Sequence, residues 1–268
     1  MPELPEVETI VQDLSKVLPG KMFSDVIVHD DFILRQKTQD FVRRLKGRII
    51  GEISRRGKAV LMHLPSDEFL VIQLMMTGQL IMKGEESKHT RITFVFSDGS
   101  RLLYNDQRRF GQIRVVENLN QIGYFNILGP EPFSEEFNPA LMQEVFRKTK
   151  RPIKNLLLDH TFVAGIGNIY ACEILFRSHI NPRRRACRIS RQEKETLHHH
   201  IVKVLREAIT HRGSSMRNYR DGDGKKGRFH ERLAVYQRQG LPCPRCHALI
   251  QRIVQAGRST FFCGKCQK

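Results

Sequence analysis

The sequence has 268 residues, of which 40% are hydrophobic, enough to build one large core or two ordinary ones. No apolar run approaches the roughly 18 residues that a membrane-spanning helix needs, so we do not expect membrane insertion. The chain opens with the acidic stretch MPELPEVE, whereas a secretory signal begins with basic residues and continues into an apolar segment. We therefore expect a globular protein of the cytoplasm.

The net charge of +17 is unevenly distributed along the chain. Residues 1–180 contain 24 Lys and Arg against 22 Asp and Glu, whereas residues 181–268 contain 21 against 6. Such clustering predicts a surface that binds a polyanion, with nucleic acid as the leading candidate and an anionic membrane surface as the weaker one. A role in solubility alone is the alternative, although solubility does not require the charges to cluster.

Residues 1–130 are predicted to form a domain of one helix and many strands. Pro5 suits the first turn of a helix, and Gly20 is predicted to end it. The apolar face of this helix is expected to comprise Val7, Ile10, Val11, Leu14, Val17 and Leu18. From about residue 22 to 118, short β-rich runs alternate with turn sequences such as SDGS and RRGK. This pattern predicts an antiparallel β-sandwich or barrel with the helix packed on it.

The rest of the chain is predicted to be mainly helical up to a C-terminal ribbon. The stretch LGPEPFSEEFNP is typical of a linker, which places a domain boundary near residue 130. Helical spacing follows, so a second domain is expected over residues 131–232. Within it, the glycine-rich, basic segment 213–232 is predicted to be a long mobile loop. Residues 233–268 are expected to form a separate ribbon.

Four cysteines near the C-terminus predict a zinc site. They are Cys243, Cys246, Cys263 and Cys266. Their spacing, C-x2-C-x16-C-x2-C, is typical of a four-cysteine zinc ribbon with a β-hairpin between the two pairs. Four thiolates leave no open position for water, so the Zn²⁺ is expected to be structural. Two disulfides would use the same residues but are rare in a reducing cytoplasm. Cys172 is predicted to be a small buried hydrophobe, and Cys187 has no assigned role.

The segment VAGIGNIYACEILF predicts a phosphate-binding turn. Gly165 and Gly167 precede Asn168 and a predicted helix, whose N-terminus offers unpaired N–H groups to an anion. An ordinary tight turn between two helices is the alternative. Lys154 and the basic run NPRRRACR favour phosphate binding, because they could follow a nucleic-acid backbone by charge.

Three motifs together resemble the bacterial formamidopyrimidine-DNA glycosylase family. They are PELPEVE at the start, GxGNxY before a helix, and a four-cysteine ribbon with AGR in its hairpin; LGPEP and SRRGK fit as well. The resemblance covers the whole chain and implies an α+β, multidomain fold. That fold has an N-terminal helix with an antiparallel β-sandwich, followed by a C-terminal helical domain with a helix-two-turns-helix motif and a zinc-ribbon hairpin.

The resemblance also implies a base-excision-repair enzyme. It removes oxidised purines, such as 8-oxoguanine and formamidopyrimidines, from duplex DNA and then cuts the abasic strand by β,δ-elimination. By similarity, removal of Met1 exposes the amine of Pro2 as the nucleophile that forms a Schiff base, and Glu3 is the general acid/base. Lys58 and Arg258 are implied as proton donors or DNA contacts. An α-amine titrates roughly 2.5 pH units below a lysine, so it is far more often in the neutral, nucleophilic form.

A base inside a duplex must be flipped out before it can be processed, and the resemblance assigns residues to this step. The wedge residues, which fill the vacated space, are implied to be Met76, Arg108 and Phe110. Arg108 would also contact the orphaned partner base. The positions implied to contact DNA phosphates are Lys58, His89, Lys154, Asn168 and Arg258.

The sequence departs from the family pattern at four positions without losing a proposed catalytic group. These are Gln73, Thr77, Ser259 and Phe261. They bear on the details of DNA contact and on the ranking of lesions. Tyr236 is expected to support the ribbon, and Glu6 is expected either to take part in recognition or to cap the first helix.

Two alternatives remain open at this point. An endonuclease VIII-like enzyme would prefer oxidised pyrimidines, although that branch typically has glycine where Leu4 stands. A non-catalytic DNA-binding protein would share the zinc ribbon and the basic surface. We expect a monomer that binds damaged double-stranded DNA and one Zn²⁺, located in the cytoplasm and associated with the nucleoid when bound to DNA.

Overall fold

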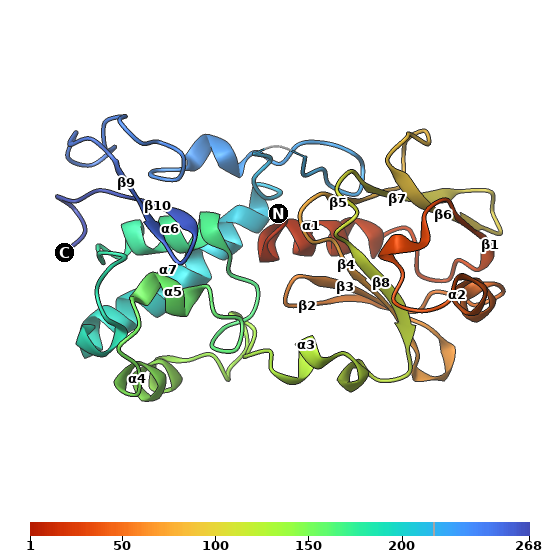
Figure 1. The fold of residues 1–268 in the computed structure, drawn as a ribbon, viewed down its shortest axis with the longest axis horizontal. Helices are drawn as coiled ribbons and strands as arrows, with labels where there is room; N and C mark the ends of the chain where they lie inside the picture. Colours follow the sequence, from red (N-terminus) through yellow and green to blue (C-terminus); the bar gives the residue numbers. More distant parts are fainter. Residues whose placement is uncertain (217) are drawn as a thin grey trace. The chain divides into compact units, whose positions relative to one another are not determined.

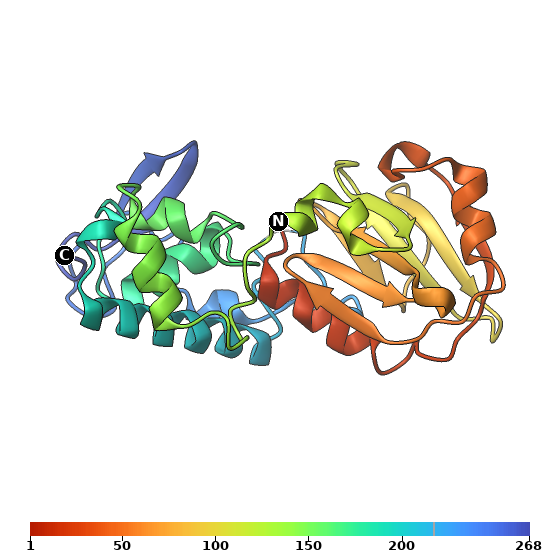
Figure 2. The same ribbon diagram turned by 90° about the horizontal axis from the view of Figure 1, so that it is seen from below.

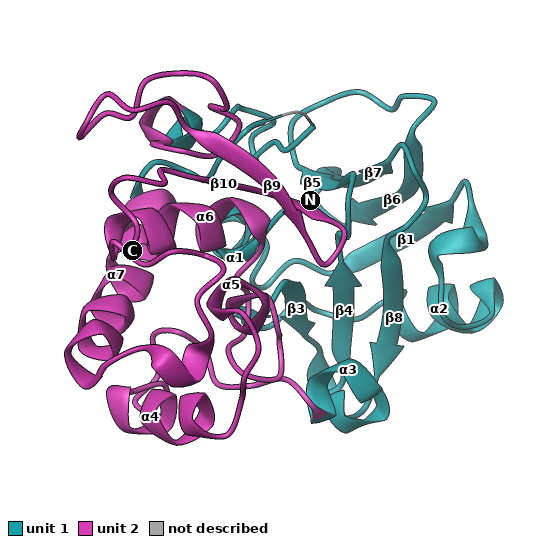
Figure 3. Ribbon diagram, turned by 60° about the vertical axis from the view of Figure 1, so that its left-hand side comes forward, with its two compact units in different colours: residues 1–126, 209–230 teal, residues 127–208, 231–268 magenta. Residues whose placement is uncertain are grey.

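The computed structural model describes residues 1–216 and 218–268, so Arg217, in the predicted loop 213–232, lies outside the described residues. The chain forms two compact units (Figure 3). Unit 1 comprises residues 1–126 and 209–230, and unit 2 comprises residues 127–208 and 231–268. The predicted domains followed chain order, whereas the structure groups the segment 209–230 with the N-terminal residues.

Unit 1 contains two four-stranded antiparallel sheets, as the alternating pattern predicts (Figure 1). The first has the order β1–β6–β7–β5, and the second has the order β2–β3–β4–β8. The strands of the first sheet are β1 (Phe23–Val28), β6 (Thr90–Phe96), β7 (Arg101–Asp106) and β5 (Gly78–Ile81). Those of the second are β2 (Ile53–Arg56), β3 (Ala59–His63), β4 (Phe69–Gln73) and β8 (Gln112–Val116).

Both predicted turns connect antiparallel neighbours. SDGS joins β6 to β7, and the Gly57–Lys58 pair joins β2 to β3, where Arg56 pairs with Ala59. Side chains of both sheets belong to one buried cluster, so the sheets share a core. The prediction of an antiparallel sandwich is confirmed.

Helix α1 (Leu4–Leu14) packs on the second sheet and buries Val7 and Ile10 in the common core. It ends at Leu14 rather than near Gly20. Because the chain turns there, Val17 leaves the apolar face and is 45% exposed, so its predicted burial is wrong.

A second helix in unit 1, α2 (Thr38–Leu45), was not predicted from the sequence. Only Phe41 and Leu45 of its residues are buried, which is too short an apolar stripe to stand out among strand patterns. Figures 1 and 2 show α1 and α2 at opposite ends of the sandwich. A short helix, α3 (Gly123–Asn126), and four 3₁₀ turns complete the unit's regular elements among the described residues: η1 (Asp31–Ile33), η2 (Pro65–Asp67), η3 (Leu119–Gln121) and η5 (Phe229–Arg232), whose last two residues belong to unit 2.

Unit 2 is mainly helical with a C-terminal hairpin, as predicted. Its elements are α4 (Pro139–Arg147), α5 (Ile153–Leu157), α6 (Asn168–Arg177), η4 (Ala186–Arg188), α7 (Arg191–Thr210, which ends in unit 1), β9 (Gln251–Gln255) and β10 (Arg258–Phe262). Figure 2 shows α7 running along the unit. Among the described residues, no helix combines the length and the apolar character that crossing a bilayer requires.

Candidate functional site

The four predicted metal ligands lie together at the base of the β9–β10 hairpin in unit 2. Their Sγ atoms all lie within 4.8 Å of one another. The distance from Cys243 Sγ to Cys266 Sγ is 3.9 Å, and that from Cys246 Sγ to Cys263 Sγ is 3.5 Å. Sulfur atoms placed tetrahedrally at about 2.3 Å from Zn²⁺ are about 3.8 Å apart, so the four thiols fit one zinc ion.

An apolar cluster in unit 2 supports the ribbon. It joins Cys172 and Phe176 of α6 to Phe261 of β10 and to the buried cysteines. The ring of Tyr236 lies edge-on to that of Phe261, with centroids 5.2 Å apart. Phe261 is thus a packing residue, Tyr236 supports the ribbon as expected, and Cys172 is buried as predicted.

Lys154 is wholly buried and connects two of the predicted phosphate-binding segments of unit 2. Its Nζ donates to Asn168 Oδ1 at 2.6 Å and to Thr260 Oγ1 at 2.7 Å. The Asn168 amide in turn donates to the carbonyl of Ser259 at 2.9 Å. The Lys154 ammonium thus holds the start of α6 against β10 in this structure, and its contact with a DNA phosphate stays a prediction.

Arg258 lies at the exposed tip of the zinc ribbon. It pairs with Gln255 across a turn in which both Ala256 and Gly257 have positive φ, the geometry of a tight hairpin. Among the described residues, no carboxylate forms an ion pair with its guanidinium. Ser259 accepts hydrogen bonds from Arg252 at 3.0 and 2.9 Å, so it stiffens the hairpin beside Arg258.

The N-terminal residues of unit 1 form a buried group at the start of α1. Pro2 is buried, and Glu3 is 3% exposed. The Glu6 carboxylate accepts the N–H of Glu3 at 2.8 Å and the N–H of Ser214 at 2.7 Å. The Glu6 carboxylate therefore caps α1 and also binds the segment 213–216, whereas its expected part in recognition stays a prediction.

The close approach of that segment depends on glycine. Gly213 has φ +74°, and an added Cβ would lie 2.7 Å from Glu6 Oε1. The Tyr219 hydroxyl donates to the Glu6 carbonyl at 3.4 Å, and burial followed by the charge of Glu6 raises the tyrosine pKa well above its usual range. The segment predicted as a loop is therefore tied to the first turn of α1.

A second anchor for the same segment involves residues that the sequence analysis missed. Arg212 forms ion pairs of 2.6 Å with both Asp13 of α1 and Asp221. Asp221 is fully buried and also accepts the N–H groups of Asp223 and Lys225, at 3.1 and 2.8 Å. Asp13 and Arg212 are 199 residues apart, so local patterning carries no signal for their ion pair. The mobility of the loop stays a prediction.

Lys58 lies in the turn between β2 and β3, on a hairpin that is fastened to α1. Arg55 Nε donates to Glu8 Oε2 at 2.8 Å, and Arg55 also donates to the carbonyl of Gly57 at 2.9 Å. The hairpin that carries Lys58 is thus held against α1, the helix that Glu3 immediately precedes. Both belong to the same unit.

Of the three predicted wedge residues, Arg108 contacts the other two on the surface of unit 1. Arg108 donates to Met76 Sδ at 3.1 Å, and its guanidinium lies 4.5 Å from the centroid of the Phe110 ring. Met76 is 40% exposed and Phe110 is 45% exposed. Both side chains therefore present apolar surface to the solvent, and their role as a wedge stays a prediction.

A buried carboxylate shapes the loop that presents Arg108. Asp106 accepts the N–H of Gly111 at 2.8 Å and a hydrogen bond from Thr77, whose hydroxyl in turn accepts the N–H of Arg108 at 2.9 Å. An added Cβ on Gly111 would lie 1.7 Å from the Tyr104 hydroxyl, so only glycine fits. Thr77 thus has a structural use, and Asp106 was missed by the sequence analysis.

The neighbouring Arg109 is occupied elsewhere. Its Nε lies 2.7 Å from Asp30 Oδ2, and its guanidinium covers the Phe32 ring at 4.8 Å. The structure therefore separates the two adjacent arginines, because only Arg108 joins Met76 and Phe110.

His89 and Gln73, also in unit 1, lie at strand ends. His89 immediately precedes β6, and its carbonyl accepts the N–H of Asp106 at 2.9 Å. It lines a pocket of about 460 Å³ with Gln107 and Asn218. Gln73 ends β4, where it pairs with Ala59.

Glu173 is a further buried acid in unit 2 that the sequence analysis missed. It accepts the backbone N–H groups of Ala234, Val235 and Tyr236 at 2.9, 3.0 and 2.9 Å. Burial raises the pKa of this carboxyl, while the three N–H groups oppose the shift. The contacts fix the chain entering the ribbon onto α6.

Three family models match successive parts of the chain. They are the formamidopyrimidine-DNA glycosylase N-terminal domain over residues 1–113, the formamidopyrimidine-DNA glycosylase H2TH domain over 128–220, and the zinc finger found in FPG and IleRS over 240–268. The formamidopyrimidine-DNA glycosylase of Chloroflexus aurantiacus is 41% identical over 100% of this chain and 98% of its own length. The chain belongs to the formamidopyrimidine-DNA glycosylase family.

Solved structures agree with this assignment. The crystal structure of the MutM (Fpg) protein of Thermus thermophilus matches with a TM-score of 0.91 and 40% identity, covering 99% of this chain and 98% of that one. A Lactococcus lactis Fpg variant in complex with Fapy-dG-containing DNA matches with a TM-score of 0.92 and 35% identity, covering 100% of both chains. As a member of the family, the chain is a base-excision DNA glycosylase with abasic-site lyase activity, and its four-cysteine ribbon is a zinc finger.

Proposed function

We propose that this glycosylase removes oxidised purines from duplex DNA with Pro2 as its nucleophile and Glu3 as its general acid/base. The observation that carries the proposal is the N-terminal arrangement of unit 1. Pro2 and Glu3 are buried at the start of α1, Glu6 holds the Glu3 backbone, and the hairpin of Lys58 is fastened to the same helix. A buried amine beside a carboxylate is suited to covalent catalysis with proton transfer.

The reaction needs the amine that removal of Met1 exposes. The Pro2 nitrogen bonds to C1′ of the damaged nucleotide while the bond between C1′ and the base breaks, and the base leaves with the electron pair and takes up the proton that the Pro2 nitrogen loses. Glu3 donates a proton to O4′ as the sugar ring opens, which leaves an iminium ion between Pro2 and C1′. Loss of a C2′ proton expels the 3′ phosphate, a further proton loss expels the 5′ phosphate, and water releases Pro2.

The wedge residues support extrusion of the damaged nucleotide. Met76 and Phe110 expose apolar groups that can fill the vacated space, offsetting an unstacking cost of a few kcal/mol. Arg108 lies against both side chains and can donate to the orphaned base. His89 and Lys58 are proposed to contact DNA phosphates from the same unit.

In unit 2, we assign the phosphate contacts to Asn168 and to Arg258. Lys154 is assigned a positioning role instead, since its ammonium is buried between Asn168 and Thr260. We further propose that the enzyme acts as a monomer. Its proposed location is the nucleoid of the bacterial cytoplasm, because the proposed substrate is chromosomal DNA.

Borohydride trapping tests the proposed function. The protein without Met1 should form a covalent adduct with a duplex containing oxidised guanine, and peptide mapping should place the adduct on Pro2. Pro2→Gly should lose most of the adduct while still binding DNA. Absence of an adduct with the unaltered protein would overturn the mechanism, and faster excision of oxidised pyrimidines in a parallel assay would overturn the lesion class.

Arg258→Ala should weaken DNA binding at every sequence. The salt slope, which is the change of log K with log salt concentration, should decrease in magnitude by about 0.9, the value of one lost phosphate contact. The zinc content should be unchanged because the side chain lies at the ribbon's exposed tip. Binding titrations at several salt concentrations measure the effect. Arg191→Ala is the control, since this exposed arginine is paired with Glu195 at 3.2 Å. Equal slopes for both variants would contradict a phosphate contact by Arg258.

A further inference from the structure

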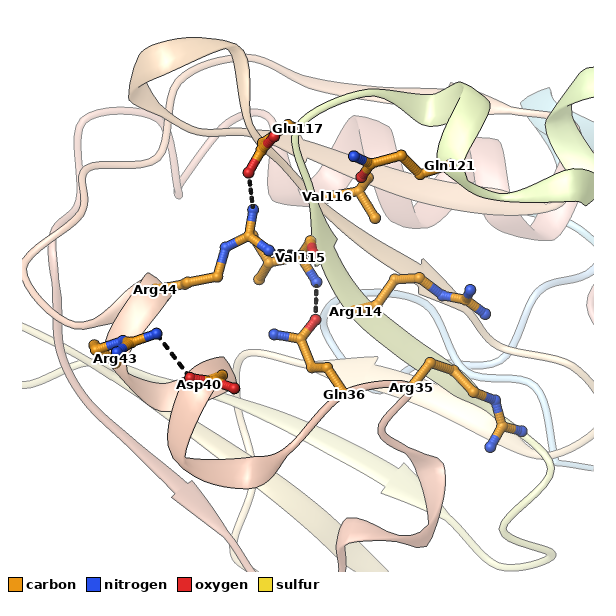
Figure 4. A pocket seen from close by; sticks show the side chains of 10 residues that line it. All are labelled: Arg35, Gln36, Asp40, Arg43, Arg44, Arg114, Val115, Val116, Glu117 and Gln121. Carbon is orange, nitrogen blue, oxygen red and sulfur yellow. Dashed lines mark hydrogen bonds and ion pairs between the residues drawn. The ribbon is translucent and has the colours of Figure 1, made fainter.

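A pocket of about 510 Å³ in unit 1 lies between α2 and β8, apart from the wedge residues and the N-terminal group (Figure 4). Four arginines line it, and they differ in how their charges are used. They are Arg35, Arg43, Arg44 and Arg114.

Two of these arginines are neutralised by carboxylates. Arg43 forms an ion pair of 2.7 Å with Asp40 on the same helix. Arg44 forms one of 2.5 Å with Glu68, and it also donates to the carbonyl of Val115 at 2.9 Å. Their charges are therefore balanced within the protein.

The other two have only neutral hydrogen-bond partners. Arg114 donates to the Gln112 amide at 2.9 Å, and Arg35 donates to the carbonyl of Phe32 at 3.5 Å. Within the described parts of the chain, no carboxylate forms an ion pair with either of them. Figure 4 shows both side chains extending toward the same side of the pocket, away from Glu117 and Asp40.

The two like charges affect each other. Burial, and then the charge of Arg35, lowers the pKa of Arg114 from its ordinary value, although an arginine remains charged at neutral pH. Two adjacent guanidinium groups without a carboxylate repel each other and present several N–H donors. An anion placed between them removes the repulsion and accepts charge-assisted hydrogen bonds.

Arg114 follows Phe110 of the wedge along the chain, and Arg35 lies on a segment that runs beside Arg114. Arg109 forms an ion pair with Asp30, and the Arg35 N–H donates to the carbonyl of Ile113 at 3.0 Å. The segments 30–35 and 109–114 therefore lie side by side. From Phe110 to Arg114 the extended chain covers about 13 Å. At about 3.4 Å per base pair, this reaches about four base pairs along a duplex.

We propose that Arg35 and Arg114 together bind one phosphodiester of the DNA duplex, within about four base pairs of the flipped nucleotide. This inference rests on the proposed function, because it takes the wedge to mark the position of the lesion. The contact would extend the DNA footprint beyond the catalytic site and would be indifferent to base sequence.

Salt-dependent binding of the full chain to duplexes of different length tests the proposal. The ligand is a duplex with a stable abasic-site analogue, carrying long arms on both sides or an arm of about two base pairs on either side. The variants are Arg35→Gln, Arg114→Gln and the double variant. Arg43→Gln is the matched control, because it removes a neutralised arginine from the same pocket.

On the long duplex, the double variant should bind several-fold more weakly than the unaltered protein. The magnitude of its salt slope should be smaller by about 0.9. Shortening one arm of the duplex should abolish the difference in salt slope between the double variant and the unaltered protein. Shortening the other arm should leave that difference in place. Arg43→Gln should match the unaltered protein throughout. A double variant with the slope of Arg43→Gln on every duplex would overturn the proposal.

Two further measurements remove ambiguity. Arg114→Lys keeps the charge and should retain most of the slope, which guards against a folding defect of Arg114→Gln on β8. Titration with inorganic phosphate should show at most weak binding; a tight phosphate site that requires both arginines, together with unchanged DNA slopes, would overturn the DNA contact. Failure of the unaltered protein to bind DNA would overturn both the proposed function and this contact. Normal binding by the unaltered protein, with variants that bind equally well, would overturn only this contact.

Discussion

Replacement of Glu3 by glutamine is expected to lower the rate of base excision by roughly 10²- to 10⁴-fold, the usual contribution of a positioned general acid/base. Glutamine keeps the size of the side chain but cannot donate a carboxyl proton. Glu3 is 3% exposed, so bulk water has little access to replace it. Single-turnover excision of oxidised guanine measures the effect.

The Glu3 variant should still bind DNA, because Glu3 is not among the proposed phosphate contacts. Its affinity and salt slope on abasic-analogue DNA should therefore equal those of the unaltered protein. Glu52→Gln is the control for removal of an exposed carboxylate from the same unit. An unchanged excision rate in Glu3→Gln would exclude Glu3 as the proton donor.

Cys263→Ser should reduce bound zinc to near zero and unfold the ribbon. The thiolate is one of four that converge within 4.8 Å, and it is buried in the apolar cluster with Phe261 and Cys172. Structural zinc sites contribute on the order of 10 kcal/mol in small ribbon peptides, so three thiolates should not hold the fold. Metal analysis and limited proteolysis of the full chain measure both effects.

Loss of the ribbon should also weaken DNA binding, because Arg258 projects from it and Lys154 binds to Thr260 of the same hairpin. Cys187→Ser is the matched control, since Cys187 is exposed and lies outside the metal cluster. It should keep zinc, proteolytic resistance and affinity. Full zinc occupancy in Cys263→Ser would refute the four-thiolate site.

Local patterns were sufficient for the zinc ligands, most of the strands and the first helix. The spacing of Cys243 to Cys266 defines a metal site because each C-x2-C turn presents two thiolates in one direction. The end of α1 was less predictable, since Val17 continues the apolar periodicity beyond Leu14 and yet lies exposed. Periodicity shows where a helix can continue, whereas packing decides where it ends.

The distant partners of the buried acids were beyond local reasoning. Glu6 and Ser214 are 208 residues apart, and Glu173 accepts hydrogen bonds from a segment about sixty positions away. Each side chain satisfies backbone N–H groups that folding would otherwise leave buried without partners. A single sequence contains no spacing from which such pairs follow.

The family and the metal ligands follow from the sequence alone, and so does the prediction of a reactive N-terminus, because each depends on residues adjacent or regularly spaced along the chain. The folded chain was needed to show that Lys154 is buried, that Arg108 rather than Arg109 contacts Met76 and Phe110, and that Arg35 and Arg114 line one pocket. Burial and charge pairing depend on which distant segments meet, and the energy of each such contact is set by the groups that surround it in space.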